Sequence, residues 1–390
     1  MSTIFFWILI GIFLYSYIGF MLLLFIINLC KKIFWKKKKR LGLSTYEPEI
    51  TLFIPSFNEK EITDSKIQNS FALDYPQNKI QHVWVTDGST DGTPEYLKKY
   101  DSIIVFHENE RKGKIGAMNR GIKLVKTPIV IFSDANTVLG KNTIREIIKE
   151  FEDEQVGCVA GEKRIIGHIS DKAVGSGEGI YWQYESILKR LESDIYSTVG
   201  AAGELFAIRR ELYEEVEPDT ILDDFVVSLK IAQKGYKIKY APKAQAFENS
   251  SFNIHEELKR KTRIAAGCIQ TLLRMKSLLN PFKYHFLSFE YFSHKVLRWT
   301  VIPFLFIIIP LLNFWMISLH HLVIYELMFI CECLFYLLVI IGRLLRDHNV
   351  RFKIFFIPYY IFFMNYSIII GIFKYLSGKQ SVNWDKARRA

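Results

Sequence analysis

The chain has 390 residues, of which 50% are hydrophobic and 15% aromatic, and 51 basic against 40 acidic residues give a formal net charge of +11. A disordered chain lacks this apolar content, and a plain cytosolic enzyme does not carry so many unevenly placed aromatic residues. The five cysteines are scattered without zinc-ligand spacing, which is typical of reduced thiols.

An apolar run at residues 4–29 is long enough to cross a bilayer, which needs about 20 residues. It is longer than the apolar core of a cleaved signal peptide. A basic run at 31–40 follows it directly, so the positive-inside rule predicts an external amino terminus and a cytoplasmic continuation. A nucleic-acid-binding tail is the alternative interpretation of this run, but its place beside a membrane span favours lipid headgroups.

Residues 44–280 alternate short β-rich runs with helical patterns, which predicts an α/β domain with a mostly parallel sheet covered on both faces. The predicted strands are 50–54, 82–86, 103–107, 129–133, 156–161, 204–209 and 237–240, and the predicted helices are 61–71, 93–99, 116–125, 143–152, 179–191 and 224–234. A domain of about 240 residues can bury a large core without help.

Membrane character returns after Pro281. Residues 281–298 mix aromatic and basic residues, as an interfacial amphipathic helix does. Two apolar stretches, 299–319 and 322–342, are joined by two histidines and predict a membrane hairpin, and the arginines that follow indicate the cytoplasmic side. The expected organisation is an N-terminal membrane helix with a basic segment (1–43), the α/β domain (44–280), an interfacial segment (281–298), and C-terminal membrane helices with a basic tail (299–390).

A third C-terminal apolar stretch at 354–373 leaves the membrane topology open. If it crosses the bilayer, the tail with Lys379, Lys386, Arg388 and Arg389 lies outside, against the positive-inside rule. If it is re-entrant or lies in the interface, the tail stays in the cytoplasm. We favour a membrane-embedded segment with a cytoplasmic tail, and the sequence does not decide between the two.

Four polar motifs follow predicted strands or open a helix: P-S-F-N-E at 55–59, D-G-S-T-D-G at 87–92, D-A-N at 134–136 and L-D-D at 222–224. Each motif alone is explained equally well by a turn or a helix cap. Ligands of open parallel sheets bind at the carboxyl ends of the strands. The occurrence of all four motifs in this order therefore predicts one shared site.

This order, together with G-K-x-x-A-x-N at 113–119, resembles the inverting family 2 glycosyltransferases, in the style of the membrane-embedded cellulose, hyaluronan and poly-N-acetylglucosamine synthases. The resemblance covers about residues 48–270. It implies a GT-A fold, a Rossmann-like cytoplasmic domain flanked by transmembrane helices. It also implies a nucleotide-diphosphate sugar as donor, with a UDP-sugar favoured, and Mg2+ or Mn2+ as the metal.

The resemblance also assigns substrate and metal roles. Asp87 matches the aspartate that contacts the nucleotide, and Glu59 lies in the loop beside the base and ribose. The other matched positions near the nucleotide are Pro55, Asn58, Ser89, Asp91, Lys114 and Asn119. Asp134 and Asn136 match the D-x-D motif that holds metal and diphosphate. Asn136 replaces the usual second aspartate, and its amide oxygen can still ligate the metal with one negative charge fewer.

Asp224 matches the general base of the family, which must reach the acceptor hydroxyl. Asp223 beside it would raise the pKa of Asp224 if both were buried together. An inverting displacement needs no enzyme nucleophile. Gly203, in a small-residue run, matches either an acceptor pocket or a tight turn.

The family's Q-x-x-R-W motif falls at residues 260–264. Arg263 matches the arginine that contacts the pyrophosphate, while Arg260 and Ile264 replace the glutamine and the acceptor-stacking tryptophan. This loss speaks against long-chain processivity, and the basic cluster has a lipid-facing helix as its alternative interpretation. A cluster of Tyr181, Trp182 and Tyr184 has a helical spacing more typical of a core than of an acceptor platform.

The sequence thus predicts an inverting, metal-dependent glycosyltransferase in the cell membrane, multi-pass with a cytoplasmic catalytic domain, acting in cell-surface polysaccharide synthesis. Its expected partners are the sugar nucleotide, a glycan or lipid-linked acceptor and membrane lipids. A processive synthase-translocase is the alternative within this class, and a catalytically silent scaffold with a GT-A binding domain is the alternative from another class. No nucleic-acid partner is expected, because the basic residues do not interleave with base-stacking aromatic residues.

Overall fold

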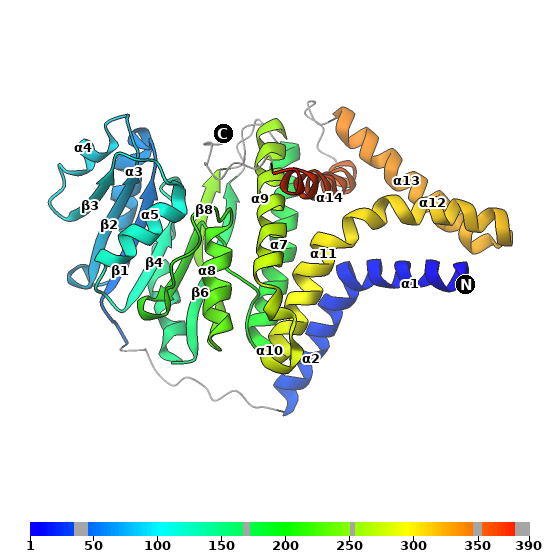
Figure 1. The fold of residues 1–390 in the computed structure, drawn as a ribbon, viewed down its shortest axis with the longest axis horizontal. Coiled ribbons are helices and arrows are strands. Elements are labelled where there is room, and N and C mark those ends of the chain that lie inside the picture. Colours follow the sequence, from blue (N-terminus) through cyan, green and yellow to red (C-terminus); the bar gives the residue numbers. More distant parts are fainter. Residues whose placement is uncertain (35–45, 167–171, 250–253, 346–352, 379–390) are drawn as a thin grey trace.

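The structure is a computed structural model that describes residues 1–34, 46–166, 172–249, 254–345 and 353–378. The predicted basic residues at 36–40 and the basic tail at 379–390 lie outside the described residues. Figure 1 shows the α/β domain on one side of the molecule and a group of long helices that extends away from it on the other.

An eight-stranded sheet, in the order β3-β2-β1-β4-β7-β6-β8-β5, forms the centre of the α/β domain. The strands are β1 (Ile50–Ser56), β2 (Ile80–Asp87), β3 (Ile103–Glu108), β4 (Ile129–Ser133), β5 (Val138–Leu139), β6 (Val156–Ile166), β7 (Leu205–Arg209) and β8 (Lys237–Asn249). The first four strands pair in parallel and β6 pairs in parallel with β8, while β7 and β5 run antiparallel to their neighbours. The predicted mostly parallel sheet is confirmed.

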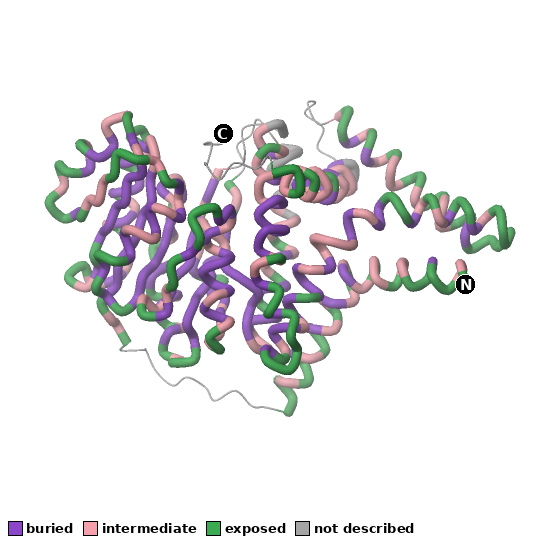
Figure 2. The backbone as a smooth tube through the Cα atoms, viewed as in Figure 1, coloured by how far each residue is buried: buried purple, intermediate pink, exposed green. Residues whose placement is uncertain are grey.

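Helices cover both faces of this sheet because side chains alternate along each buried strand. On β1, Phe53 joins a core with the helices Gly113–Gly121 and Asp223–Gln233, while Leu52 and Ile54 join a second core with the helices Lys60–Phe71 and Thr143–Ile148. The helices of the domain are α3 (Lys60–Phe71), α4 (Thr93–Leu97), α5 (Gly113–Gly121), α6 (Thr143–Ile148), α7 (Lys172–Ile195), α8 (Asp223–Gln233) and α9 (Ile254–Arg274). Short 3-10 turns connect some of them at Gln77–Lys79, Ile122–Leu124, Lys149–Glu152, Arg210–Leu212 and Lys276–Leu279. Figure 2 shows the buried strands between these helices.

Gly200 provides a test of the packing beneath α8. Its φ is +84°, and a Cβ atom at this position would lie 2.1 Å from the ring of Phe225. We expect Gly200→Ala to lower the free energy of unfolding by about 2–4 kcal/mol, since left-handed strain and overpacking add. Thermal unfolding of the detergent-solubilised protein measures this loss. Gly235→Ala is the matched control, because its φ is +92° with no neighbouring atom within 4 Å of the added carbon, and an equal loss in both variants would contradict the packing argument.

Within the described part of the chain, four helices are long and apolar enough to cross a membrane: Ser2–Phe34, Ile302–His320, Val323–Leu345 and Phe356–Leu376. The first comprises α1 (Ser2–Leu14), a π-helical turn (Tyr15–Gly19) and α2 (Phe20–Phe34); the others belong to α12 (Ile302–His320), α13 (Val323–Leu345) and α14 (Lys353–Leu376). Their length and composition agree with the predicted membrane spans.

The segment before α12 is helical, as α10 (Pro281–Glu290), a π-helical turn (Tyr291–Val296) and α11 (Leu297–Thr300). Tyr284, Leu287 and Tyr291 are buried in the same core as α5 and α8. This segment therefore packs into the α/β domain, and its predicted interfacial character stays a prediction. Along the other side of the domain, Phe20 and Leu24 of α2 pack on Leu188 and Leu191 of α7.

Candidate functional site

The loops that follow β1 and β2 are joined by hydrogen bonds at the carboxyl edge of the sheet. Asn58 adopts a left-handed conformation (φ +53°), and its N–H donates to Ser89 Oγ at 3.1 Å, while its Oδ1 accepts from the Thr90 N–H at 2.8 Å. The Lys60 N–H donates to Asp91 Oδ2 at 3.0 Å, and Glu59 beside it is buried. The first two motifs are therefore one structural unit, with Pro55 inside β1 at its base.

Asp87 ends β2 and meets the amino terminus of α5. Its Oδ2 accepts from the Gly113 N–H at 2.6 Å and from the Lys112 N–H at 3.0 Å, and its Oδ1 accepts from Arg120 Nη2 at 2.9 Å. Free N–H groups and the dipole at a helix start favour a carboxylate there. Asp87 is thus fixed at a position between the two loops and α5.

Lys114, the next residue of α5, connects three further carboxylates. Its Nζ lies 2.7 Å from Asp134 Oδ1, at the end of β4, and 3.5 Å from Asp223 Oδ2, at the start of α8. Gly203 borders the same space, because a Cβ atom there would lie 3.1 Å from Lys114 Nζ and 3.3 Å from Asp224 Oδ2. Consecutive residues of α5 therefore join the Asp87 loops to the Asp134 and Asp223–Asp224 loops.

Burial and mutual repulsion set the protonation of this cluster. Burial and the Asp223 carboxylate raise the pKa of Asp224 to about 7. Burial also raises the pKa of Asp134, against the effect of Lys114. Burial alone would lower the pKa of Lys114, but the three carboxylates raise it above its ordinary value. The cluster thus holds a firmly charged ammonium beside a carboxyl group that titrates near neutral pH.

Asn136 faces a second charged group that sequence reasoning missed. Its Nδ2 donates to Glu248 Oε1 at 3.5 Å, and Glu248 Oε2 lies 2.6 Å from Lys163 Nζ. Lys163 also pairs with Glu204. Burial favours the neutral acid, yet Lys163 lowers the pKa of Glu204 to about 2. The sequence contained one signal for this group: Lys163 and Glu248 are charged residues within the strands β6 and β8.

Lys66 of α3 was also missed. It is buried, and its Nζ donates to Ser133 Oγ at 2.7 Å and to the Thr137 carbonyl at 2.8 Å. Burial lowers the pKa of Lys66 to about 7, against the attraction of Asp134. Lys66 therefore holds the D-A-N turn in place, on the side of Asp134 away from α5.

The donor set fits one mode of metal binding. Among the described residues, no three His, Cys, Asp or Glu side chains form a group that could hold a metal ion. Asp134 and Asn136 together offer carboxylate and amide oxygens, which suit Mg2+ or Mn2+ when substrate phosphates complete the coordination. A closed cage made of protein ligands alone does not fit these residues.

Asn119 and Arg263 were both predicted to contact the sugar nucleotide. Asn119 donates from Nδ2 to the Val216 carbonyl at 2.8 Å and accepts at Oδ1 from the Tyr213 hydroxyl at 2.7 Å, so its amide holds residues 213–216. Arg263 lies half-buried on α9, and its predicted contact with pyrophosphate stays a prediction, as does the nucleotide role of Asn119.

Helix α9 holds the segment that leads into Asp223. Gln270 accepts at Oε1 from the Ile221 N–H at 3.0 Å and donates from Nε2 to the Asp219 carbonyl at 2.8 Å. One turn later, Arg274 Nη1 donates to Thr220 Oγ1 at 2.9 Å. Residues 219–221 are therefore fixed to α9 directly before the predicted base.

A cavity of about 330 Å³ lies beside this site, between α7, α9, α11 and α14. Six aromatic side chains are part of its lining: Tyr17, Tyr181, Trp182, Tyr184, Trp299 and Tyr360. The ring of Trp299 contacts that of Phe225, the residue after Asp224, with centroids 5.4 Å apart. One wall of the cavity therefore contacts the residue after the predicted base. The cluster at 181–184 lines this hollow, and Tyr184 also packs against the core formed by α2 and α7.

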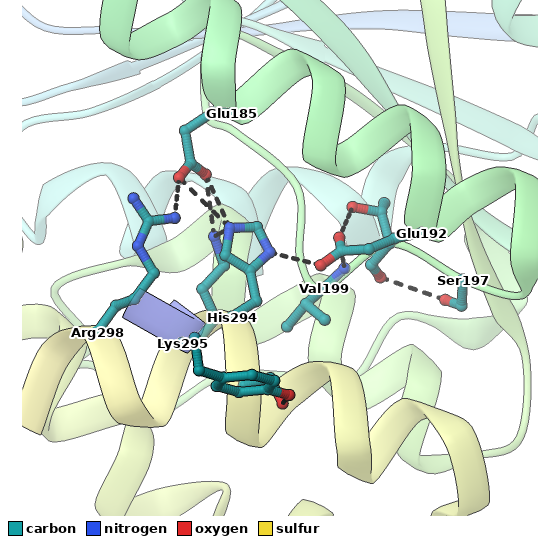
Figure 3. Close-up of polar contacts among 10 residues, drawn as sticks. Glu185, Glu192, Ser197, Val199, His294, Lys295 and Arg298 are labelled. Carbon is teal, nitrogen blue, oxygen red and sulfur yellow. Dashed lines mark hydrogen bonds and ion pairs between the residues drawn. The ribbon is translucent and has the colours of Figure 1, made fainter. Parts of the chain in front are cut away.

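A buried ion-pair network closes one side of the cavity (Figure 3). Glu185 of α7 accepts from Arg298 Nη1 at 2.6 Å and lies 3.1 Å from His294 Nε2, and His294 Nδ1 lies 2.5 Å from Glu192 Oε1. Burial would raise the pKa of Glu185, but Lys295, His294 and Arg298 hold it well below its usual range. The network ties α7 to the helices that lead into the membrane segments.

Comparison with known proteins gives consistent similarities. The family model described as Glycosyl transferase family 2 matches residues 51–217. A poly-beta-1,6-N-acetyl-D-glucosamine synthase of Staphylococcus aureus (strain COL) is 28% identical over 255 residues, which cover 63% of this chain and 60% of the relative. The corresponding synthase of Staphylococcus epidermidis is 29% identical over 236 residues, covering 58% and 56%. The chain thus spans about 60% of the length of the curated relatives that it matches.

Among solved structures, the mannosyltransferase PcManGT from Pyrobaculum calidifontis, in complex with GDP-Man and Mn2+, aligns with a TM-score of 0.69. The alignment covers 96% of this chain and 99% of that one at 22% sequence identity, so it establishes the fold. The predicted GT-A fold is confirmed. The family model covers the motifs from Asn58 to Gly203, so residues 51–217 match a Glycosyl transferase family 2 domain.

Proposed function

We propose that this chain is a membrane-bound glycosyltransferase that moves a sugar from a nucleotide-diphosphate donor to a glycan or lipid-linked acceptor. One observation carries the proposal: the first turn of α5 holds Asp87 through the Gly113 N–H and joins Asp134 to Asp223 through Lys114. These contacts support a shared site for the residues matched to nucleotide, diphosphate and acceptor.

The proposed reaction is a single displacement with inversion. Asp224 accepts the proton of the acceptor hydroxyl, the acceptor oxygen bonds to the anomeric carbon, and the nucleoside diphosphate leaves with the electrons of the broken bond. A base with a pKa of about 7 is matched to neutral pH. Lys114 places a positive charge beside the diphosphate position.

Asp134 and Asn136 are the residues that would hold Mg2+ or Mn2+. When bound, the metal neutralises charge on the departing diphosphate. The structural neighbour was determined with GDP-Man and Mn2+, which supports a sugar nucleotide and a divalent metal here. The names of the curated relatives support an N-acetylglucosamine donor and cell-surface polysaccharide as the product class.

Donor profiling tests this proposal. The purified full chain in detergent is incubated with a panel of UDP- and GDP-sugars and Mg2+ or Mn2+, and nucleoside diphosphate release is followed. We expect release from one donor with metal and none after chelation. Failure of every donor, while the protein stays folded, would support the catalytically silent scaffold.

The aromatic cavity beside Asp224 supports a saccharide acceptor. Tyrosine and tryptophan rings offer both an apolar face and a polar edge, which suits sugar rings. The cavity also favours the processive alternative, because it gives a growing chain an aromatic site that Ile264 does not supply. Its wall includes Trp182, Trp299 and Ile264.

We expect Trp182→Leu to raise the acceptor KM about tenfold, which corresponds to roughly 1.4 kcal/mol, and to leave the donor KM unchanged. Trp182 lines the cavity, while the contacts described for the nucleotide loops do not involve it. Transfer to short N-acetylglucosamine oligosaccharides of increasing concentration measures both constants. Trp182→Phe keeps an aromatic face and is the control; a matching rise in the donor KM would argue against an acceptor role.

We further propose a location in the cell membrane with the α/β domain on the cytoplasmic side. Lys31 and Lys32 lie in the last turn of α2, and Arg343 lies in the last turn of α13. Basic residues at these ends favour a cytoplasmic position. Both ends would then lie on the side of the catalytic domain.

A further inference from the structure

Three of the long helices extend from the α/β domain toward a common far end. At that end, Thr3 Oγ1 of α1 lies 3.1 Å from His320 Nε2 of α12, and the rings of Phe6 and Tyr325 lie 5.6 Å apart. At the domain end, α12 begins shortly after α11, which contains Trp299, and the ring of Trp299 contacts Phe225. Figure 1 shows α1, α12 and α13 extending away from the domain.

Helix α14 follows a different course. It is drawn foreshortened in the view in which α1, α12 and α13 run lengthwise, so its axis is inclined to theirs (Figure 1). Its contacts agree with this. The ring of Tyr360 lies 6.5 Å from that of Tyr181 on α7, and Asn365 Nδ2 donates to the Tyr17 hydroxyl at 2.9 Å. At Gly371, a Cβ atom would lie 2.4 Å from Ala265 Cβ on α9.

These contacts extend over about 16 Å of helix, at 1.5 Å per residue. Along that length α14 packs against α7, the π-helical turn after α1, and α9, and it also packs against α13 and α12. If α14 crossed the bilayer beside α12, it would extend away from the α/β domain toward His320, at the far end of α12. Among the contacts of the described residues, those of α14 with α13 include Phe362 on Tyr336, which lies in the half of α13 nearer Arg343.

Most buried side chains of α14 lie on one face, which consists of Phe356, Tyr360, Phe363, Ser367 and Gly371. Asn365 lies outside this face and is also buried, against Tyr17. The exposed stripe contains Tyr366, Phe373 and Leu376, whose spacing of seven and three residues places them on one helical face. An apolar face with a tyrosine suits the boundary between lipid headgroups and acyl chains.

We propose that α14 lies along the membrane surface on the side of the catalytic domain, with its exposed stripe in the lipid interface, and that, among the described helices, only Ser2–Phe34, α12 and α13 cross the bilayer. The residues after α14 then share a side with Lys32 and Arg343. This resolves the conflict in the sequence, because a fourth crossing would place the basic residues 379–389 on the opposite side. The inference rests on the proposed membrane location, which recovery in the membrane fraction tests separately.

Cysteine accessibility tests the course of α14. In a full-length chain with the exposed cysteines Cys30, Cys331 and Cys333 replaced by serine, Ser377→Cys reports the end of α14. Lys98→Cys reports the catalytic domain, and Leu322→Cys reports the turn between α12 and α13. A membrane-impermeant maleimide is applied to inverted and to right-side-out vesicles. We expect Ser377→Cys to react in the same vesicles as Lys98→Cys, and reaction in the same vesicles as Leu322→Cys would overturn the proposal.

A charge placed in the middle of each helix gives a second, independent readout. We expect Tyr366→Lys to keep the yield of membrane-inserted, folded protein within about twofold, because a lysine in the interface reaches water along its own stem. Leu334→Lys, at an exposed position in the middle of α13, is expected to lower that yield at least roughly tenfold, because its charge enters the hydrocarbon. Equal losses in both variants would also overturn the proposal.

Discussion

Replacing Asp224 with asparagine is expected to lower the rate of sugar transfer by roughly 10²–10⁴-fold, the usual contribution of a general base. The amide keeps the shape of the side chain but cannot accept the acceptor proton. Donor binding should persist, because Asp87 and the loops around Asn58 are held by α5 and by each other. The measurement is a comparison of kcat with the affinity for the donor nucleotide in the same variant.

The pH dependence of the native enzyme follows from the same group. Burial and Asp223 raise the pKa of Asp224 to about 7, and the base works only when it is ionised. The rate of transfer should therefore fall as pH drops below about 7 and level off above it. Asp223→Asn removes the neighbouring negative charge, so we expect the fall to move to lower pH in that variant. A profile that stays unchanged in Asp223→Asn, or an Asp224→Asn variant with native kcat, would contradict the assignment.

The arrangement of the sheet was predictable because its signals are local. Each of β1, β2 and β4 is a short hydrophobic run followed by a polar motif, and parallel strands bring such motifs to one edge. The proximity of the Asp87 and Asp134 motifs followed from this rule, while Asp224 follows no strand and lies in the first turn of α8. The structure adds the connection between them, through two consecutive residues of α5.

Other parts of the site depend on partners that are distant in sequence. Lys163 of β6 meets Glu248 of β8 only because these two strands pair, and no local pattern encodes that pairing. Asn119 matched a nucleotide motif, yet its contacts are with Tyr213 and Val216, about one hundred residues later in the chain. Residue type and spacing indicated that these side chains matter, while tertiary pairing decides what they touch.

The course of α14 shows, for a whole helix, the same difference between what a local sequence pattern indicates and what tertiary packing decides. Hydropathy identified an apolar segment of spanning length, because apolar content is a property of the segment itself. Orientation depends on what the segment packs against. The contacts of Asn365 with Tyr17 and of Gly371 with α9 hold it beside the domain, and neither contact has a signal in the sequence.

The second large effect is expected at the metal ligands. Asp134→Ala should abolish metal-stimulated release of nucleoside diphosphate, because it removes the one carboxylate of the pair with Asn136. Chelation of the native protein should have the same effect and should be reversed by Mg2+ or Mn2+. Release that continues at the native rate in Asp134→Ala, or after chelation, would exclude a metal at this position.

Asn136→Asp is the matched opposite change, since it restores a second carboxylate beside Asp134. In the absence of metal, the added charge faces Glu248, to which Asn136 Nδ2 now donates at 3.5 Å. A bound cation relieves that repulsion, so the variant should need about tenfold less metal for half-maximal activity, equivalent to roughly 1.4 kcal/mol. Titration of the transfer rate with Mn2+ in the native protein, in Asn136→Asp and in Asp134→Ala measures the metal concentration that each protein needs. A higher metal requirement in Asn136→Asp would show that residue 136 acts through Glu248 and Lys163 instead of through the metal.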